Sequence, residues 1–389
     1  MSALKALLED LAEQRTYRFE EPWRFSSRAL GLAVPIVRAS YGERAYLLLD
    51  EIPGGVDIRD SGEIRRLIAK SGVDKPVFIR GGLIVRGETQ PRTIRFGVII
   101  MPGEEKPIEA LCVHDVRPIR ASARMRPARD VPARLLESVI EGDQARVWSG
   151  IRARAAAVAR ARRGPSMEEI GREIARELAM MHAGLAMSYC LVLPEIETDL
   201  VRVEEELERA IRDIREVIER FPLIKDQVGV AILDARGVYA MELFDHPDSW
   251  SAVAKNAGRK FAEVLAEESE HEIFKPDKEG IMEAIRAFLS KLGESEEKVV
   301  FKSKTAYTSI LKGDGVCGEY TVLDESVIHL MAVRAEEHRF EFEAPFPDIR
   351  FEVFEVEAPR GERPERSGRR ARRGIISFFR RVLRRGTTS

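Results

Sequence analysis

Cys112 and His114 are the side chains whose types and spacing could perform nucleophilic catalysis. They lie two residues apart, so a strand would place both side chains on the same face. A thiol beside an imidazole that accepts its proton is an activated nucleophile. The alternative is a buried cysteine that packs as a small apolar side chain, which is the more common state in a strand. We favour a buried cysteine. If the site is catalytic instead, the candidates are Cys112, His114 and Asp143.

A second segment could bind phosphate. Arg80, Arg86 and Arg92 surround the pair Gly81-Gly82. Glycine lets backbone N–H groups approach an anion, and arginine side chains can pair with that anion. The simpler interpretation is a turn between two buried strands, because Gly-Gly pairs favour tight turns. The phosphate-loop pattern Gly-x-x-x-x-Gly-Lys-Ser/Thr is absent from the sequence, so we favour the turn.

Asp143, Gln144 and Trp148 stand at the start of a predicted helix. Asp143 can accept hydrogen bonds from the free N–H groups of the first turn, and Trp148 can anchor the helix in the core. The amide of Gln144 could instead bridge the base or the sugar of a ligand. We favour capping and packing, with ligand binding by Gln144 as the alternative.

Familiar catalytic and metal-binding patterns are absent. The three cysteines, Cys112, Cys190 and Cys317, are far apart and odd in number, which argues against a disulfide framework or a structural zinc site. No His-Glu-x-x-His, Gly-x-Ser-x-Gly or Cys-x-x-Cys pattern occurs. We therefore expect no bound metal and no cofactor.

The C-terminal tail carries the most informative pattern. After a basic linker at residues 360–374, apolar and basic residues recur at helical spacing. They are Ile375, Ile376, Phe378, Phe379, Arg380, Arg381, Val382, Leu383, Arg384 and Arg385. Such a helix can lie in an anionic membrane surface with its Phe and Leu side inserted and its arginines near the headgroups.

The charge of the chain is divided between the tail and the rest. Residues 360–389 contain eleven Arg and two Glu, a net charge of +9, which leaves −11 on residues 1–359. An acidic body with a basic arm is typical of an interaction tail. The arginines would also hold RNA or ribosomal phosphates. A third alternative is docking of the tail on a protein partner or on the acidic body itself. We favour the anionic membrane surface.

The composition is that of a folded protein. A chain of 389 residues with 44% hydrophobic content can form one large core or two ordinary ones. No apolar run approaches the roughly 20 residues that span a bilayer, and the first thirty residues lack a secretory signal pattern. We expect a cytoplasmic protein, which the tail would place at the inner face of the membrane. Charged residues at 33% with a single Asn and four Gln are typical of thermophilic proteins.

Hydrophobic periodicity divides the chain into six segments. They are an N-terminal amphipathic helix at 1–15, a β-rich part at 16–130, a helical part at 131–222, a part of hairpins and helices at 223–335, added strands at 336–359, and the linker and tail helix at 360–389. The apolar stripe from Asp199 to Phe221 predicts one long charged amphipathic helix. Two hairpins are predicted, Val228–Leu233 with Val238–Phe244 and Tyr320–Leu323 with Ser326–Val333. Hairpins mixed with helices indicate an α+β fold with largely antiparallel sheets.

Four stretches of the chain, taken in order, carry a family resemblance. They are Val77–Gly103, with Gly82, Gly87, Gln90 and Arg92; Cys112–Arg117; Asp143-Gln144 with Val147-Trp148; and Gln227–Trp250 followed by Gly313–Val333. They resemble the ARG and Rhodanese-Phosphatase-superfamily-associated Protein domain family, a prokaryotic family of unknown biochemical function. With Arg80, the matched residues Gly82, Gly87, Gln90, Arg92, Arg117 and Gln144 are the ligand-binding candidates.

The chain departs from the family pattern at its acidic positions. Where the pattern has acidic residues around the turn glycine, this chain has Gly81, Leu83 and Ile84. Thr89 stands where the pattern has a Lys before the Gln, and His114 stands where it has a Glu after Cys-Val. If the acidic residues of the family bind a metal or transfer protons, this chain has lost that function.

The departures and the tail lead to one hypothesis and two alternatives. We expect a non-catalytic binding or scaffold module tethered to an anionic surface by its tail. The first alternative is an enzyme that acts on a nucleotide or an ADP-ribose-like phosphate compound, as the gene associations of the family imply. The second alternative is a factor associated with RNA or the ribosome.

Overall fold

The computed structural model describes residues 2–114, 120–161, 199–268 and 275–335. The chain divides into two units, residues 1–340 and 341–389, and all described residues belong to the first. Several sequence predictions lie outside the described residues. These are Arg117, the added strands at 336–359, the basic linker at 360–374 and the tail helix at 375–385.

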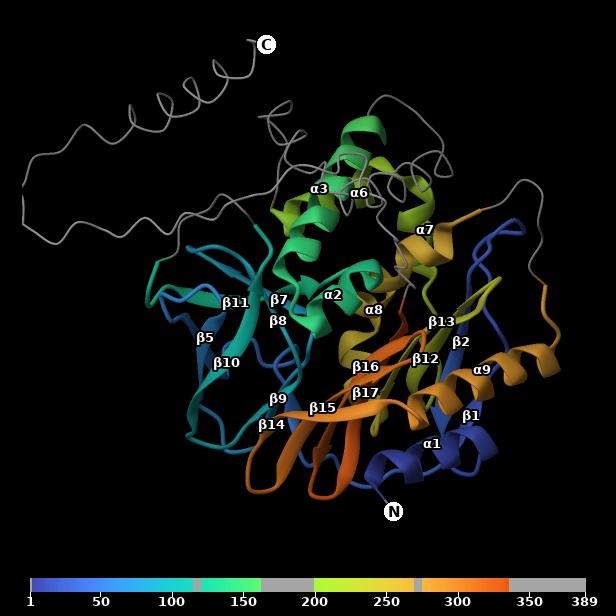
Figure 1. Ribbon diagram of the computed structural model, residues 1–389, viewed down its shortest axis with the longest axis horizontal. Coiled ribbons are helices and arrows are strands. Elements are labelled where there is room, and N and C mark those ends of the chain that lie inside the picture. Colours follow the sequence, from blue (N-terminus) through green and yellow to red (C-terminus); the bar gives the residue numbers. More distant parts are fainter. Residues whose placement is uncertain (1, 115–119, 162–198, 269–274, 336–389) are drawn as a thin grey trace, which may run out of the picture. The chain divides into compact units, whose positions relative to one another are not determined.

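Eight strands form one antiparallel sheet (Figure 1). In spatial order they are β1 (Tyr17–Phe19), β2 (Leu32–Arg38), β12 (Gln227–Asp234), β13 (Gly237–Phe244), β17 (Ser326–Arg334), β16 (Val316–Leu323), β15 (Ala306–Gly313) and β14 (Glu296–Lys302). The two hairpins that the sequence predicts are the pairs β12–β13 and β16–β17. Because β2 pairs directly with β12, residues 39–226 leave the sheet and return to it between two adjacent strands.

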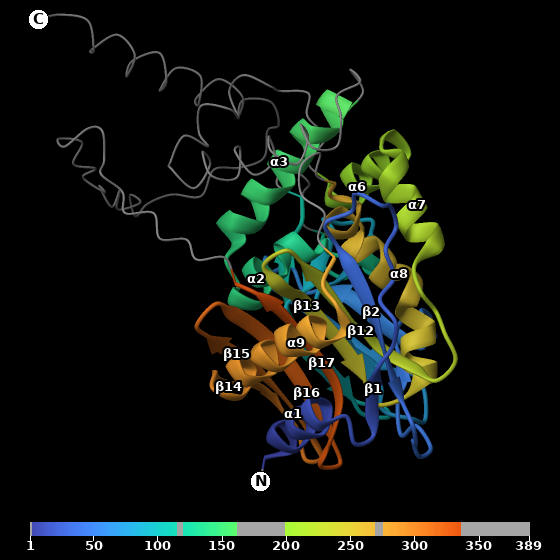
Figure 2. The ribbon, with the colours of Figure 1, turned by 90° about the vertical axis from the view of Figure 1, so that its right-hand side faces the viewer.

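Helices cover both faces of this sheet. The helix α1 (Ala3–Glu13) packs against α9 (Lys278–Gly293) on one face (Figure 2). Leu4, Leu7, Leu8 and Leu11 of α1 are buried there, as their helical spacing predicts. The helix α8 (Pro247–Ala266) packs against β12 and β13 from the other face and buries Trp250 and Phe261 completely. The sheet therefore has a separate apolar core on each face.

Residues between β2 and β12 form a closed six-stranded barrel. In order around it, the strands are β10 (Glu105–Cys112), β5 (Arg66–Ser71), β4 (Val56–Asp60), β11 (Arg124–Asp130), β7 (Leu83–Gly87) and β8 (Arg92–Ile94). Along β4 the buried Val56, Ile58 and Asp60 alternate with the partly exposed Asp57 and Arg59. Since successive side chains of a strand point to opposite faces, Asp57 and Arg59 lie on the outer wall of the barrel.

A small sheet joins the barrel to the large sheet. It consists of β3 (Leu47–Leu48), β6 (Val77–Ile79) and β9 (Val98–Ile100), with β3 parallel and β9 antiparallel to β6. Val77 and Ile79 pack in the barrel core, whereas Phe78 between them packs in the core under α8. Successive residues of one strand thus contribute to two different cores.

The predicted single helix from Asp199 to Phe221 is wrong, because the segment forms two helices. They are α6 (Leu200–Ala210) and α7 (Arg212–Arg220), separated by Ile211, whose backbone is extended with φ −109° and ψ 112°. The helix α6 packs against α3 (Gln144–Ala161), whereas α7 packs against α8. Because the two halves of the apolar stripe meet different partners, the chain turns at Ile211 and buries it.

The described residues form an α+β fold with largely antiparallel sheets, which confirms the predicted class. The helix α2 (Ala133–Glu141) and α3 lie in the helical part predicted at 131–222. Within the described ranges, no helix combines the length and the apolar character needed to cross a membrane.

Candidate functional site

Cys112 lies at the end of β10 with its thiol buried and close to the main chain of His114. Its Sγ atom is 2.6 Å from the His114 carbonyl oxygen and 3.3 Å from the His114 backbone nitrogen. The amide Nε2 of Gln90 donates a hydrogen bond to the same carbonyl at 2.6 Å. Three candidates from the sequence therefore meet at one end of the barrel, around a backbone group.

Gln144 bonds to the main chain at the end of β10, next to these residues. Its Oε1 accepts the Cys112 N–H at 2.9 Å, and its Nε2 donates to the Cys112 carbonyl at 2.7 Å. In a sheet, the backbone of a neighbouring strand would make these two hydrogen bonds, so the Gln144 amide takes the place of a strand. Gln144 is the first residue of α3, so its amide joins this helix to the barrel. Asp143 accepts the Arg146 N–H at 3.0 Å and thus caps the helix.

Arg92 is fully buried and pairs with Asp60 inside the barrel. The Nη2 atom lies 3.3 Å from Asp60 Oδ2, and Thr89 donates a hydrogen bond to the same oxygen at 2.7 Å. The Nη1 atom donates to the carbonyl of Ile64. These contacts place the guanidinium within the protein interior, away from any phosphate that approached from solvent.

Gly82 and Gly87 meet backbone requirements of the barrel. Gly82 has φ +75°, which favours glycine, and lies in the turn between β6 and β7. The predicted turn is present, but these two strands belong to different sheets and do not pair with each other, because the turn carries the chain from the small sheet into the barrel. At Gly87, a Cβ atom would overlap the carbonyl oxygen of Arg124 on β11.

A buried network of charged side chains lies at the junction of barrel and large sheet. Its members are Asp50, Arg80, Asp130, Glu242, Lys260 and His329, which we call the core charge cluster. Arg80 makes two hydrogen bonds to Asp50, at 3.1 and 2.7 Å, and two to Asp130, at 2.8 and 2.7 Å. Arg80 therefore serves a buried network rather than the phosphate cradle considered from the sequence.

Lys260 on α8 connects the two halves of this cluster. Its Nζ lies 2.9 Å from Asp130 Oδ2 and 2.8 and 2.9 Å from the two oxygens of Glu242. His329 Nε2 lies 3.4 Å from Glu242, and its ring is packed between Phe78 and Phe244. The cluster thus ties α8 and the large sheet to the barrel.

The charges of the cluster shift one another's pKa values. Burial would raise the pKa of Asp130, but Arg80 and Lys260 outweigh it and hold this pKa well below its usual range. Burial also opposes ionisation of Glu242, yet Lys260 and His329 lower its pKa to about 2. Burial lowers the pKa of His329 against the attraction of Glu242, so the imidazole favours the neutral form. Two cations then face three carboxylates.

Glu319 on β16 is a further buried carboxyl beside the cluster. Its Oε2 accepts the Gly97 N–H at 3.0 Å. Burial raises its pKa to about 7, although the Gly97 and Gly81 N–H groups and Lys260 lower it. A Cβ atom at position 81 would overlap this carboxyl. The glycine at position 81 therefore leaves room for a carboxyl from another strand.

A second buried network joins the helices that follow the barrel. Arg154 on α3 pairs with Glu204 on α6 and with Glu263 on α8, the latter at 2.6 Å. Arg129 on β11 lies 3.4 Å from Glu204 and 2.9 Å from Glu208. Burial opposes the charge of Arg154, but its two carboxylates raise the pKa above the ordinary arginine value.

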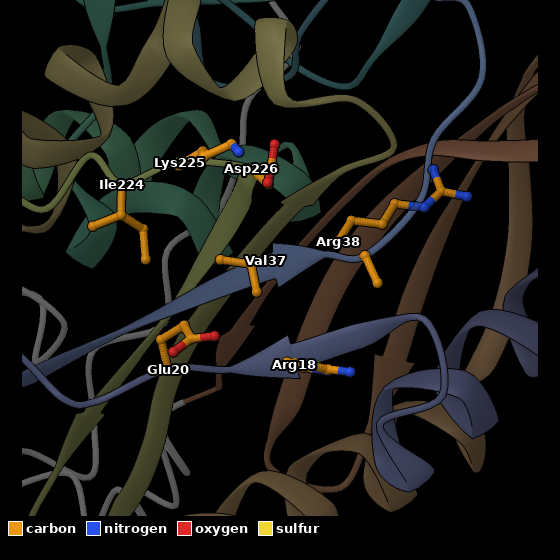
Figure 3. Close-up of a pocket in the computed structure, with 8 residues that line it drawn as sticks. Arg18, Glu20, Val37, Arg38, Ile224, Lys225 and Asp226 are labelled. Carbon is orange, nitrogen blue, oxygen red and sulfur yellow. The ribbon is translucent and has the colours of Figure 1, made fainter.

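A groove of about 370 Å³ lies over the edge of the large sheet. Figure 3 shows Val37 on β2 between Glu20 on one side and Asp226 on the other. The lining residues are Arg18, Glu20, Val37, Arg38, Ala39, Ile224, Lys225 and Asp226. None of the candidates from the sequence lines this groove, and its three cations and two carboxylates give no strong preference for either sign of charge.

Residues 16–333 match the family described as the ARG and Rhodanese-Phosphatase-superfamily-associated Protein domain. The chain belongs to this family. Searches of the curated proteins and of the solved structures found no match. The family region begins at β1 and ends in β17, so it contains the barrel, the large sheet and the core charge cluster. The basic linker and the tail lie beyond it.

The sequence reasoning singled out Arg80 but missed the other members of the core charge cluster. Asp130, Lys260 and Glu242 stand in segments that are far apart in the chain, and their pairing depends on the tertiary fold. A signal was nevertheless present: Glu242 and Glu319 are each the only charged residue in a largely apolar strand of eight residues. A lone carboxylate within a buried strand indicates a buried partner or a raised pKa.

Proposed function

We propose that this member of the family is a non-catalytic binding or scaffold module, tethered to an anionic membrane surface by residues 375–385. The tail lies outside the described residues, so its part of the proposal rests on its amphipathic and basic sequence. The part that concerns the core rests on how the candidate catalytic side chains are bonded.

The observation that carries the proposal is that the core uses these side chains for its own structure. Cys112, Gln90 and Gln144 all bond to the main chain of residues 112–114. Arg80 and Arg92 are fully buried against carboxylates. A nucleophile or a phosphate-binding arginine must reach its substrate, whereas these groups are directed into the fold.

The tail supplies both contributions that a surface helix needs. Its apolar side chains can enter the boundary between headgroups and acyl chains, and its arginines can lie near anionic headgroups. Each arginine near such a surface contributes about 1 kcal/mol, and salt screens this part. We therefore expect binding that salt weakens only in part.

Vesicle flotation tests the tether. The full chain is mixed with vesicles that contain anionic lipid, at low and at high salt, and compared with a chain that ends after Pro359. We expect only the full chain to float. A variant with Phe378→Ser and Phe379→Ser separates insertion from charge, because it keeps every arginine.

A control variant shows whether flotation depends on the tail or on any exposed arginine. The double variant Arg209→Gln/Arg212→Gln removes two exposed charges of α6 and α7 and should float like the unaltered chain. Flotation of the chain that ends after Pro359 would contradict the tether, as would a full chain that stays with the unbound protein.

One observation favours the enzyme alternative, in which the chain acts on a nucleotide or an ADP-ribose-like phosphate compound. Gln90, Cys112, His114 and Gln144 lie together at one end of the barrel. Incubation of the full chain with such compounds, followed by chromatography of the products, tests this alternative. Turnover that Cys112→Ser abolishes without loss of thermal stability would replace the scaffold proposal.

A further inference from the structure

Four arginines form a row across the outer wall of the barrel. The row consists of Arg59 on β4, Arg124 and Arg126 on β11, and Arg86 on β7, and we call it the arginine row. The side chains of Arg59, Arg86 and Arg124 are 43%, 32% and 80% exposed, and Arg126 is exposed as well. These strands are neighbours in the barrel, so the row crosses three strands without a gap.

The register sets like charges directly opposite each other. Arg124 on β11 is the cross-strand partner of Arg59 on β4, and Arg126 is the partner of Arg86 on β7. Directly opposed side chains lie about 5 Å apart at their Cβ atoms, and like charges at this distance destabilise a sheet. Along β11, the rise of a strand separates Arg124 and Arg126 by about 7 Å. The fold therefore keeps an unfavourable arrangement of charge on its surface.

Two carboxylates lie within 4 Å of three of the four arginines. Asp57 pairs with Arg59 and lies 3.7 Å from Arg124, and Asp199 lies 3.8 Å from Arg86. Among the residues that the structure describes, no carboxylate pairs with Arg126 within 4 Å. Glu88, two residues after Arg86, and Arg120, whose N–H donates to Thr89, are also exposed and carry opposite charges.

This positive surface belongs to a body that is acidic as a whole, with a net charge of −11 for residues 1–359. The contrast is local, because four arginines stand together on a body in which carboxylates outnumber cations. Arginine also offers a planar fork of donors that fits two oxygens of a phosphate. A row of such forks matches a polymer that carries a phosphate at every repeat.

The surroundings favour a nucleic-acid strand over a membrane. In the described part of the chain, no large apolar side chain that is exposed stands on β4, β7 or β11, so the row offers nothing to insert between lipids. The wall of a closed barrel is curved, and a flexible strand can follow it. Aromatic side chains for stacking bases are absent from the same three strands, so contact with phosphates would not read sequence.

We propose that the arginine row binds the phosphate backbone of a single-stranded nucleic acid without preference for its sequence. This surface is distinct from the tail that the proposed function uses for membrane binding. RNA binding by the arginine row and membrane binding by the tail can therefore be tested, and refuted, independently of each other.

Fluorescence anisotropy of a labelled single-stranded RNA of about fifteen nucleotides tests the row, with the full chain in every measurement. The variant Arg124→Gln/Arg126→Gln removes two cations from the row. The matched control Arg209→Gln/Arg212→Gln removes two exposed cations from α6 and α7. Both variants change the net charge equally and keep the tail.

We expect the row variant to raise the Kd at least about tenfold, since each arginine that it removes makes a charge-assisted hydrogen bond to a phosphate. The dependence of log K on log salt should become shallower by about 0.7 for each phosphate that the variant no longer neutralises. The control variant should match the unaltered chain, and an RNA of scrambled sequence should bind equally well. Arg124→Lys/Arg126→Lys should keep the salt dependence, because it keeps the charge.

Three results would overturn the inference. The first is no RNA binding by the unaltered chain at low salt. The second is equal Kd and equal salt dependence for the row variant and the control, which would assign RNA binding to the tail or another surface. The third is a row variant that binds RNA normally but loses vesicle flotation, which would make the row a membrane contact. Thermal unfolding of each variant shows that it is folded.

Discussion

The core charge cluster and the arginine row use the same type of side chain in opposite environments. Arg80 is fully buried and makes four hydrogen bonds to two carboxylates. Arg124 is 80% exposed and faces another arginine across the strand pair. The sequence shows an arginine in a β-rich segment in both cases. The difference teaches that partners within the fold, rather than residue type or spacing, separate a structural charge from one available to a ligand.

The energetic consequences differ in the same way. A buried ion pair contributes little compared with an apolar replacement of the whole pair, but removal of one partner leaves an uncompensated charge and is costly. An exposed ion pair contributes roughly 0 to 1 kcal/mol, so an exposed charge can be removed at little cost to folding. The two regions should therefore respond to substitution by very different amounts.

The largest effect is expected from Lys260→Met. This change leaves Glu242 without its closest cation and removes one of two cations from Asp130. The free energy of unfolding should fall by about 3 to 5 kcal/mol. Urea unfolding measures it, with Lys278→Met as the control because that side chain is 81% exposed. An unchanged urea midpoint for Lys260→Met would contradict the expected difference in stability effect between the core charge cluster and the arginine row.

Glu319 gives the next largest effect and a defined pH dependence. Its pKa is raised from 4.5 to about 7, mainly by burial. The native state therefore keeps a proton that the unfolded chain releases, so the contribution of this group to stability falls as pH rises from about 4.5 to 7. The full change is about 3 kcal/mol by linkage.

Urea unfolding between pH 5 and pH 8 detects this dependence. Glu319→Gln cannot ionise, so its stability should decline less over this range than that of the unaltered chain. The difference between the two pH profiles is the readout, since the amide also alters the bonds to the Gly97 and Gly81 N–H groups. Parallel profiles would assign the pH dependence to other groups.

A smaller effect is expected where a buried contact is polar but uncharged. Gln144→Leu leaves the N–H and the carbonyl of Cys112 without this partner, which costs about 1 to 3 kcal/mol. Gln144→Glu keeps the acceptor and loses the donor, so it should cost less at pH 4 than at pH 7. Thermal unfolding at the two pH values measures both variants, and equal losses at both values would show that the donor is unimportant.

The smallest effect is expected in the arginine row. Arg124→Ala removes one member of a like-charge pair as well as a 3.7 Å contact with Asp57. The free energy of unfolding should change by no more than about 0.5 kcal/mol in either direction. Urea unfolding at low salt measures the change. A loss of about 2 kcal/mol or more would mean that the row stabilises the fold, and the comparison with the cluster would no longer hold.

The sequence predicted those elements whose patterns are local. The leucine stripe of α1 and the two hairpins of the large sheet were confirmed, because side-chain periodicity and turn residues determine them within one segment. The strands β4, β5 and β11 lie in the β-rich part predicted at 16–130, but no local pattern identified them individually. Their charged side chains alternate with few apolar ones, as in Arg124–Asp130, and only closure of the barrel gives those charges an outer wall.

The candidate site was less accessible to sequence reasoning. Gln144 was identified, but its two bonds to the main chain of Cys112 join residues 32 positions apart. Arg80 was considered as a possible phosphate ligand, whereas its partner Asp130 lies 50 positions away and fixes it in the interior. Pairings of this kind depend on the packing of the barrel against the large sheet, which no single segment encodes.

The pairing of β2 with β12 has a consequence for synthesis of the chain. The first two strands of the large sheet emerge from the ribosome early, but the neighbour of β2 follows only after residues 39–226. Closure of so long a loop is slow, whereas the barrel strands between them pair over shorter separations. We therefore expect the barrel to fold first. Until β12 pairs with it, the apolar β2 has an unpaired edge to which strands of other chains could bind, which would favour aggregation.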